Sequence, residues 1–380
     1  MRIRSAKLYA LGIPFRESFS HALKVRRGSD ALVLRVESDD GVVGYGEAAP
    51  RPYVSGESVD SVLEHLPNVL WPALRGVDLP DADNPNILST LQDAIPDERD
   101  DTVIAHNASR SACEVALLDC ALRRAGRPLS EILPPVRKKV RYDGAIDSST
   151  TKKAARLARV MKTARLSQIK VKVGLENDAE RLAEIRRIMG PDKSIRVDAN
   201  CAWSVEEAVE ALAELAQFGI EAVEQPIPRG DVDALRRLRD QIEIPIVVDE
   251  SLVTIEDAEA LIAAQACDVF NIRVSKCGGF GHCLTLAEMA RSNGLAVQVG
   301  AHVGETAILS AAGRHLAAAL PDVKYLEGSY GTLVLSEDVA SVSIKFGFGG
   351  TGKLLRGPGL GIRVKDSQLE KFALRTVEMN

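Results

Sequence analysis

The stretch at residues 168–174, QIKVKVG, is typical of a buried strand, yet it carries two lysines. Successive side chains of a strand point to opposite sides, so Lys170 and Lys172 project together while the apolar residues project the other way. Two ammonium groups at this spacing repel each other. Either another feature of the molecule favours this arrangement, or both lysines lie in solvent.

This stretch is one of eight short apolar runs that alternate with helical patterns at a period of roughly 25 residues, the scale of one strand-helix unit. The runs lie at 140–146, 168–174, 194–200, 219–226, 244–251, 267–276, 295–302 and 323–329. Strands joined by a crossover helix pair in parallel, so eight units most simply close into a (β/α)8-type (TIM-like) barrel. Ser204 and Glu207 predict a capping box at the start of one barrel helix, 205–218.

The segments on either side of the barrel have another pattern. Residues 1–130 combine alternating strands, an Asp40-Gly41 hairpin turn and a helical segment at 109–125, which predicts an N-terminal α+β capping domain. Residues 131–335 form the predicted barrel. Residues 336–380 return to short strands with many glycines and are expected to pack back on the capping domain.

The composition excludes several classes of protein. The chain has 380 residues and a formal net charge of -5 with mixed signs, which leaves no basic footprint for nucleic acid. Neither a run of 18 apolar residues nor a signal peptide is present, so we expect a cytoplasmic protein without membrane contact. The six cysteines lack metal or disulfide spacing, and GFGGTGKL (347–354) fails as a phosphate loop because Leu354 replaces the required hydroxyl residue.

Carboxylates stand at the ends of three successive predicted strands, the rim on which such barrels place their chemistry. They are Asp198, Glu224 and Asp249, with Asn200 and Glu250 directly beyond two of them. Three unpaired carboxylates at the ends of apolar strands would cost free energy, because each would be buried and they would repel one another. A bound hard divalent cation would remove this repulsion. Oxygen ligands suit Mg²⁺. The alternative is that these groups pair with helix termini or arginines.

A further lysine, Lys276 in VSKCGG, ends the sixth run, four strands beyond Lys170 and Lys172. Four strands are half a circuit of an eight-stranded barrel, so we expect the lysines to face each other across the metal. A lysine that removes a proton beside a carboxylate must be neutral, and a neighbouring cation disfavours its ammonium form. This accounts for the Lys170-Lys172 pair.

These motifs resemble the muconate lactonizing enzyme (muconate cycloisomerase) subgroup of the enolase superfamily, which includes the mandelate racemase type. The likeness covers nearly the whole chain, including SACEVALLDCALRRAGRPLSEIL at 111–133. It implies Asp198, Glu224 and Asp249 as ligands of one Mg²⁺, for which Mn²⁺ is an expected substitute. It also implies Lys172 and Lys276 as acid/base catalysts, with Lys170 disfavouring the ammonium of Lys172 and contacting the substrate carboxylate. A small-molecule carboxylate substrate and a homo-oligomer are further expectations.

The subgroup divides by substrate into cycloisomerases, o-succinylbenzoate synthases, N-acylamino acid racemases and dipeptide epimerases. Dipeptide epimerases commonly carry Asp-x-Asp at the last strand to hold an ammonium group, whereas this chain has Glu327 and Ser329. We expect a cycloisomerase or a racemase/epimerase of an amino-acid derivative. The alternatives are a dipeptide epimerase, an o-succinylbenzoate synthase-like lyase, and a catalytically silent binding barrel.

The remaining candidates for substrate binding come from two capping loops, residues 16–25 and 47–57, and from the seventh strand. They are Arg16, His21, Arg51, Tyr53, His302 and Glu305. His302 either contacts substrate or packs at the rim. For the loop residues, the alternative is ordinary solvated side chains.

Overall fold

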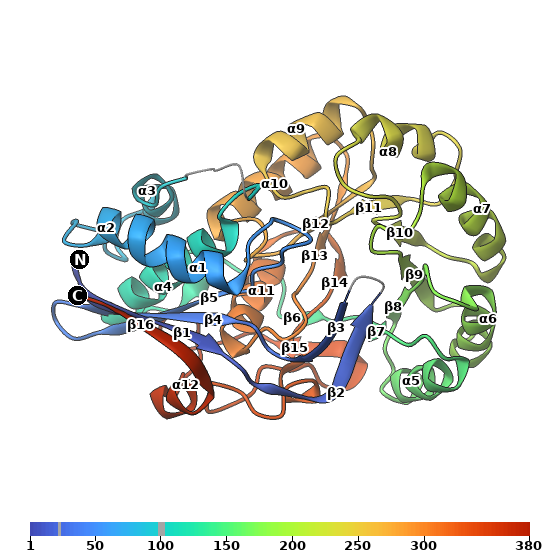
Figure 1. Cartoon of the computed structure of the whole chain (residues 1–380). Helices are drawn as coiled ribbons and strands as arrows, with labels where there is room; N and C mark the ends of the chain where they lie inside the picture. Colours follow the sequence, from blue (N-terminus) through green and yellow to red (C-terminus); the bar gives the residue numbers. More distant parts are fainter. Residues whose placement is uncertain (22–23, 98–102) are drawn as a thin grey trace.

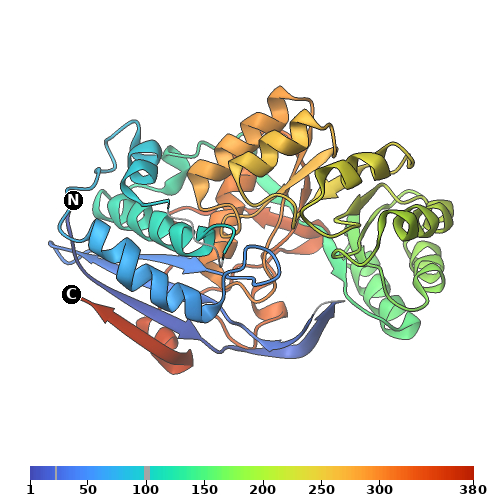
Figure 2. The ribbon, with the colours of Figure 1, turned by 45° about the horizontal axis from the view of Figure 1, so that its top comes forward.

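The N-terminal part of the chain is a four-stranded sheet in the order β16-β1-β4-β5. The computed structural model describes residues 1–21, 24–97 and 103–380, and for residues 18–21 and 24–26 it describes the backbone alone. The strands are β1 (Ile3–Leu11), β4 (Leu32–Ser38), β5 (Val43–Ala48) and β16 (Ala373–Met379). The last strand thus pairs antiparallel with the first, which places both termini at one end of the molecule (Figure 1). Helices α1 (Val59–His65) and α4 (Asn107–Arg124) lie on one face of this sheet (Figure 2).

The eight predicted strands form one parallel sheet, which confirms the predicted barrel class. They are β7 (Gly144–Ile146), β8 (Gln168–Lys172), β9 (Ser194–Asp198), β10 (Ala222–Glu224), β11 (Ile246–Val248), β12 (Val269–Ile272), β13 (Ala296–Val299) and β14 (Val323–Leu326). Neighbours in the sheet are neighbours in the sequence. The end strands β7 and β14 share no ladder among the described residues, but the amide of Asp143 donates to Leu326 O over 2.8 Å at this junction.

One helix joins each pair of successive barrel strands. These helices are α5 (Thr151–Thr163), α6 (Asp178–Met189), α7 (Val205–Leu215), α8 (Val232–Arg239), α9 (Ile255–Ala263), α10 (Phe280–Ser292) and α11 (Ala307–Ala319). The capping box of Ser204 and Glu207 forms as predicted. After β14 the chain departs from the repeat, because it passes through short turns instead of an eighth barrel helix and then enters α12 (Asp366–Phe372) and β16.

The shorter elements connect these parts. They are β2 (Pro14–His21), β3 (Lys24–Gly28), a π-helical turn (Leu66–Leu70), α2 (Trp71–Leu74), α3 (Ile87–Ala94), β6 (Lys139–Arg141) and β15 (Thr351–Lys353). Strand β15 pairs with β6 at the entrance to the barrel. Among the described helices, none combines the length and apolar composition that a membrane crossing needs.

The interior of the barrel has an apolar floor and a charged upper part. The floor is a small cluster separate from the main core, formed by Ala222, Val247, Val269 and Tyr325. Two residues further along the strands, on the same face, come polar and charged side chains such as Glu224 and Asn271. The main core fills the space between the strands, the helices and the capping domain, and the charged groups gather at the carboxyl ends of the strands.

Candidate active site

Three buried carboxylates form a row across neighbouring strands. Asp198 ends β9, Glu224 ends β10 directly opposite it in the ladder, and Asp249 follows the last residue of β11. All three are at most 2% exposed. The sequence therefore placed these groups correctly at one rim, and we call them the acidic row.

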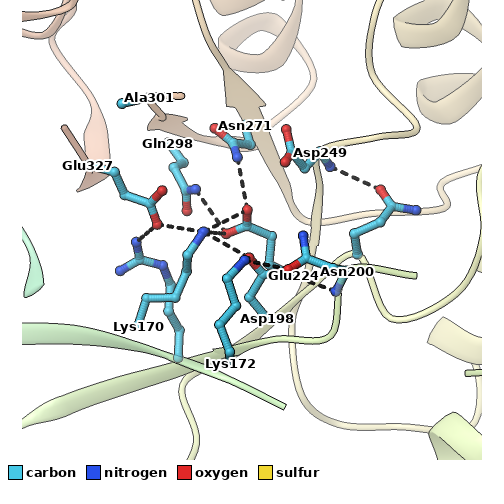
Figure 3. Close-up of polar contacts among 12 residues, drawn as sticks. Lys170, Lys172, Asp198, Asn200, Glu224, Asp249, Asn271, Gln298, Ala301 and Glu327 are labelled. Atoms are coloured by element: carbon cyan, nitrogen blue, oxygen red, sulfur yellow. Dashed lines mark hydrogen bonds and ion pairs between the residues drawn. The ribbon is translucent and has the colours of Figure 1, made fainter. Parts of the chain in front are cut away.

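Lys170 neutralises much of the acidic row. Its ammonium lies 2.9 Å from Asp198 Oδ2, 3.0 Å from Glu224 Oε1 and 2.8 Å from Glu327 Oε1 (Figure 3). Burial alone would lower the pKa of Lys170, but the three carboxylates outweigh burial and raise it well above the ordinary value. The three carboxylates thus favour the ammonium form of Lys170 inside the barrel, which answers the question that its place in QIKVKVG raises.

The other two lysines bind opposite ends of the acidic row. Lys172 Nζ donates to Asp198 Oδ2 over 2.6 Å and also to Asn200 Oδ1. Lys276 lies beyond the end of β12, and its Nζ donates to Asp249 Oδ1 over 2.9 Å and to Asp249 O over 2.8 Å. One lysine thus approaches the row from the side of β8 and the other from the side of β12.

Two amides hold Glu224 in place from the barrel interior. Asn271 Nδ2 donates to Glu224 Oε1 and Gln298 Nε2 donates to Oε2, each over 3.0 Å. The carbonyl oxygens of both amides are buried and have no hydrogen-bond partner among the described residues. Burial and the charges of Asp198, Glu327 and Asp249 raise the pKa of Glu224, whereas Lys170 lowers it. The amides and Lys170 thus offset part of the cost of this central carboxylate.

Sequence reasoning missed two arginines at the centre of the site. Arg196 donates to Asp143 Oδ2 over 2.6 Å and also to Glu327 Oε1. Arg273 binds Asp249 Oδ2 and donates to Ala301 O over 3.0 Å. Arg196 lies two residues before Asp198, and Arg273 lies two residues after Asn271. The alternation of side chains along a strand could therefore have predicted that both arginines point into the barrel.

The residues around the acidic row fit a hard cation in chemistry. The donor set consists of carboxylate and amide oxygens, which are the ligands that Mg²⁺ prefers. The carboxylate of Glu250 accepts from Asn200 Nδ2 over 3.2 Å, while its Oε2 is buried without a partner. Burial and then Asp249 and Asp198 raise the pKa of Glu250 to about 8. A positive charge at this place would relieve that mutual repulsion.

The carboxylates do not converge on a single point in this structure. Among the described residues, no three acidic, imidazole or thiol groups are placed to hold one ion. Each member of the acidic row pairs instead with a lysine, and Asp249 also pairs with Arg273. The alternative of carboxylates paired with arginines is realised, in the described part of the chain, only through Arg273, which binds Asp249 and lies 3.6 Å from Glu224, whereas the main partners of the row are lysines.

A cavity adjoins the row at the ends of β13 and β14. Its lining includes Tyr142, Arg273, His302, Glu305, Glu327 and Ser329. Glu305 accepts from the amide of His302 over 3.1 Å and from Ser310 Oγ over 3.0 Å, and burial raises its pKa to about 7. Ser329 Oγ donates to Tyr142 OH over 2.8 Å. The structure thus brings together His302, Glu305, Glu327 and Ser329, four of the residues that the sequence analysis proposes for substrate binding.

The predicted residues of the capping loops are spread more widely. Arg16 is exposed and donates to Thr332 O and Ser336 O, at 2.7 and 3.1 Å. Arg51 is buried and donates to Val303 O over 2.9 Å, so it ties its loop to the barrel. Tyr53 packs beside the cluster of Val54, Ala105 and Val253. His21 lies outside the residues whose side chains the structure describes.

A row of acids flanked by lysines at the carboxyl rim of a capped parallel barrel defines a barrel enzyme of the enolase class. Comparison with known proteins supports this class. The family model "Mandelate racemase / muconate lactonizing enzyme, N-terminal domain" matches residues 5–134, and "Enolase C-terminal domain-like" matches residues 152–368. The chain belongs to this family and is an isomerase of the enolase superfamily.

Individual relatives show several activities on the same fold. The N-succinyl-L-Arg/Lys racemase of Bacillus cereus is 27% identical over 98% of both chains, and its crystal structure has a TM-score of 0.90 at 26% identity with 100% of both chains covered. The dipeptide epimerase of Cytophaga hutchinsonii, in complex with Mg and D-Ala-L-Val, has a TM-score of 0.88 at 30% identity with 100% of both chains covered. Muconate cycloisomerase 1 of Pseudomonas putida is 30% identical over 93% of both chains.

Proposed function

We propose that this chain interconverts the two configurations at the carbon beside a substrate carboxylate, with an N-acylated amino acid as substrate. The observation that carries the proposal is the placement of Lys172 and Lys276 at opposite ends of one acidic row, bound to Asp198 and Asp249. Two bases on opposite sides are what inversion requires, since a planar enolate changes configuration only when the proton returns to its other face.

The acidic row would hold one Mg²⁺ through Asp198, Glu224 and Asp249, and Mn²⁺ is expected to substitute. When bound, the cation supplies positive charge that offsets the negative charge developing on the substrate carboxylate. Asn200 and Glu250 would support the ligands, since Asn200 bonds Asp198 through its backbone amide and Glu250 through its side chain. The Mg in two dipeptide epimerase structures similar to this chain supports the choice of metal.

The chain's own groups divide the work as follows. Lys172 in its neutral form accepts the α-proton of one enantiomer at Nζ, and Lys276 donates a proton from Nζ to the opposite face. The two lysines exchange roles for the other enantiomer. Lys170 stays charged and attracts the substrate carboxylate, because Asp198, Glu224 and Glu327 stabilise its ammonium form. The capping loops that carry Arg16, His21, Arg51 and Tyr53 would exclude water from the reacting carbon.

The state of Glu327 supports an acylated amine over a free one. Its Oε1 is already shared between Lys170 and Arg196. Burial would raise the pKa of Glu327, but these two cations lower it to about 2. A substrate ammonium would have to displace one of them, and Ser329 is neutral. His302, Glu305 and Ser329, which line the cavity beside the acidic row, would contact the substrate.

A cycloisomerase is the second candidate. The single acid at the end of β14, Glu327, is similar to the pattern of muconate cycloisomerases, and one such relative is 30% identical over 93% of both chains. The same enolate chemistry then needs only one lysine to move the proton. Dipeptide epimerisation and lyase chemistry are further outcomes that a substrate screen would reveal.

The test is a screen of N-acylamino acids, dipeptides and muconates in deuterated buffer, followed by proton NMR, polarimetry and ultraviolet absorbance. We expect exchange of the α-hydrogen and racemisation of an N-acylamino acid, both lost when excess chelator removes Mg²⁺ and restored by Mg²⁺ or Mn²⁺. Ultraviolet changes with a muconate alone would support the cycloisomerase. Lack of turnover and of exchange with every compound would support the silent barrel.

Variants of the two lysines test the stereochemical assignment. Lys276→Ala should stop net racemisation yet leave Lys172 able to exchange the α-hydrogen of its own enantiomer, and Lys172→Ala should show the mirror pattern. In a cycloisomerase, only one substitution should abolish exchange. Wild-type turnover in both variants would remove the lysines from catalysis.

We also expect a cytoplasmic homo-oligomer. The resemblance to the muconate lactonizing enzyme subgroup is the ground for the expected assembly. Light scattering of the purified protein would give the number of subunits, and a fluorescent fusion would show the compartment. A monomer at micromolar concentration would contradict the first expectation.

A further inference from the structure

Helix α4 lies against the loop that carries Lys276, although it belongs to the N-terminal part of the chain. Asn107 and Glu114 stand seven residues apart, about two turns of helix, and therefore share one face. Asn107 Nδ2 donates to Lys276 O over 2.7 Å, and Glu114 Oε1 accepts from the amides of Phe280 and Gly281. This face thus contacts the middle of the loop between β12 and α10 and the first residues of α10.

The glycine pair that follows Lys276 fits this contact. A Cβ at Gly278 would lie 2.9 Å from Asn107 Oδ1, and one at Gly279 would lie 2.6 Å from Glu114 Oε1. Both glycines also have positive φ, +85° and +111°. The KCGG motif therefore allows α4 to approach the loop closely, because side chains at the two glycine positions would collide with Asn107 and Glu114.

The amide of Asn107 joins two loops of the barrel. Besides Lys276 O, its Nδ2 donates to Val253 O over 2.8 Å, and Val253 lies four residues beyond Asp249. Asn107 is 3% exposed, so both donor hydrogens are used away from water. One side chain thus sets the backbone of the loop carrying Lys276 against the loop that follows Asp249.

We propose that Asn107 is a positioning residue that fixes where Lys276 meets the substrate. The inference rests on the proposed role of Lys276 as one of two bases. Its effect is one-sided, because Asp198 and Asn200 hold Lys172 on the other side of the acidic row. Loss of the amide would let the backbone of Lys276 shift and leave Lys172 in place.

The test compares α-hydrogen exchange of the two enantiomers of one active substrate in deuterated buffer. Asn107→Leu keeps a similar size and removes both donors, and Asn107→Asp replaces the donors with an acceptor. The control is Arg124→Met at the other end of the same helix, because Arg124 donates to Asp40 and Asp81 of the N-terminal part of the chain. Thermal unfolding is recorded for each variant, and Lys172→Ala and Lys276→Ala are assayed in parallel.

We expect either Asn107 variant to lower exchange of the enantiomer served by Lys276 about tenfold or more, since small displacements of a catalytic group are costly. Exchange of the other enantiomer should stay close to wild type. Arg124→Met should leave the ratio of the two exchange rates unchanged. An equal loss for both enantiomers, or no loss, would overturn the inference about Asn107. The proposed function would still stand if Lys172→Ala and Lys276→Ala each abolish exchange of only one enantiomer. If Lys276→Ala is itself not one-sided, the proposed function and this inference fail together.

Discussion

The ammonium of Lys170 lies 2.8 Å from Glu327 Oε1, which joins β8 to the end of β14 across the charged interior of the barrel. The same oxygen accepts from Arg196 of β9. Lys170 also contacts Asp198 and Glu224 of the acidic row. Glu327, which the sequence predicts to bind substrate, therefore has a second role as the counterion of two buried cations.

Replacing Glu327 by Gln should separate the role in substrate binding from the role as counterion. We expect the free energy of unfolding to fall by about 3 kcal/mol, because Lys170 and Arg196 each lose a buried partner. If the substrate has no free amine, the preference for N-acylamino acids over dipeptides should persist in the folded variant. The matched control is Glu337→Gln, which breaks an exposed pair with Lys371 and should leave the denaturation midpoint unchanged. A selective loss of dipeptide turnover in Glu327→Gln would instead assign Glu327 to an ammonium group.

Replacing Glu224 by Gln should remove metal-dependent activity while preserving the fold. The new amide would point a donor at Asn271, Gln298 or Lys170, all of which already donate to this position. We expect turnover to fall about a hundredfold or more, because metal charge stabilisation is worth several kcal/mol. Titration calorimetry with Mg²⁺ should show weakened binding.

Glu221 provides the control for Glu224→Gln, since it lies just before the same strand at the opposite end and contacts Ser194 and Tyr325. Glu221→Gln should keep wild-type affinity for Mg²⁺. Full activity of Glu224→Gln, or of the wild type in excess chelator, would remove the acidic row from metal binding.

Stability should depend on the protonation of His315, which lies on α11 with Nε2 3.1 Å from Leu360 O. Burial lowers the pKa of His315 from 6.5 to about 4. Between these values the unfolded chain binds more protons than the folded protein, so the free energy of unfolding falls as the pH falls from 6.5 to 4. This group contributes a loss of about 3 kcal/mol over that window. Urea denaturation of wild type and His315→Gln should show a smaller loss in the variant, and identical slopes against pH would contradict the assignment.

Two glycines with positive φ should respond differently to alanine. Gly279→Ala places a Cβ 2.6 Å from Glu114 Oε1, whereas the Cβ of Gly294→Ala meets nothing within 4 Å. Backbone strain costs about 1 kcal/mol or more in both variants, and only Gly279→Ala adds a collision with a buried carboxylate. We therefore expect the lower denaturation midpoint for Gly279→Ala. Equal midpoints would show that neither the collision with Glu114 nor the backbone conformation of Gly279 makes that position more demanding than Gly294.

Local patterns predicted most of the barrel and its acidic rim. The period-two pattern placed Lys170 and Lys172 on one face, and the ends of the apolar runs placed Asp198, Glu224 and Asp249 at one rim. These features are local in sequence, because strand periodicity and the direction of parallel strands follow from a few consecutive residues. The helix predicted at 109–125 is α4, 107–124, which differs only at its ends.

Only the tertiary structure decided which charges meet. Lys276 pairs with Asp249 and Lys170 with Glu327, although each pair is far apart in the sequence. The alternation of side chains along their strands points Arg196 and Arg273 into the barrel, but only the barrel brings them to Glu327 and Asp249. The pairing of β16 with β1 and the bond from Asn107 to Lys276 O, 169 residues apart, likewise arise from chain segments that meet in space. Periodicity tells which way a side chain points, whereas its partner depends on how the barrel strands are arranged and on the domain packed against them.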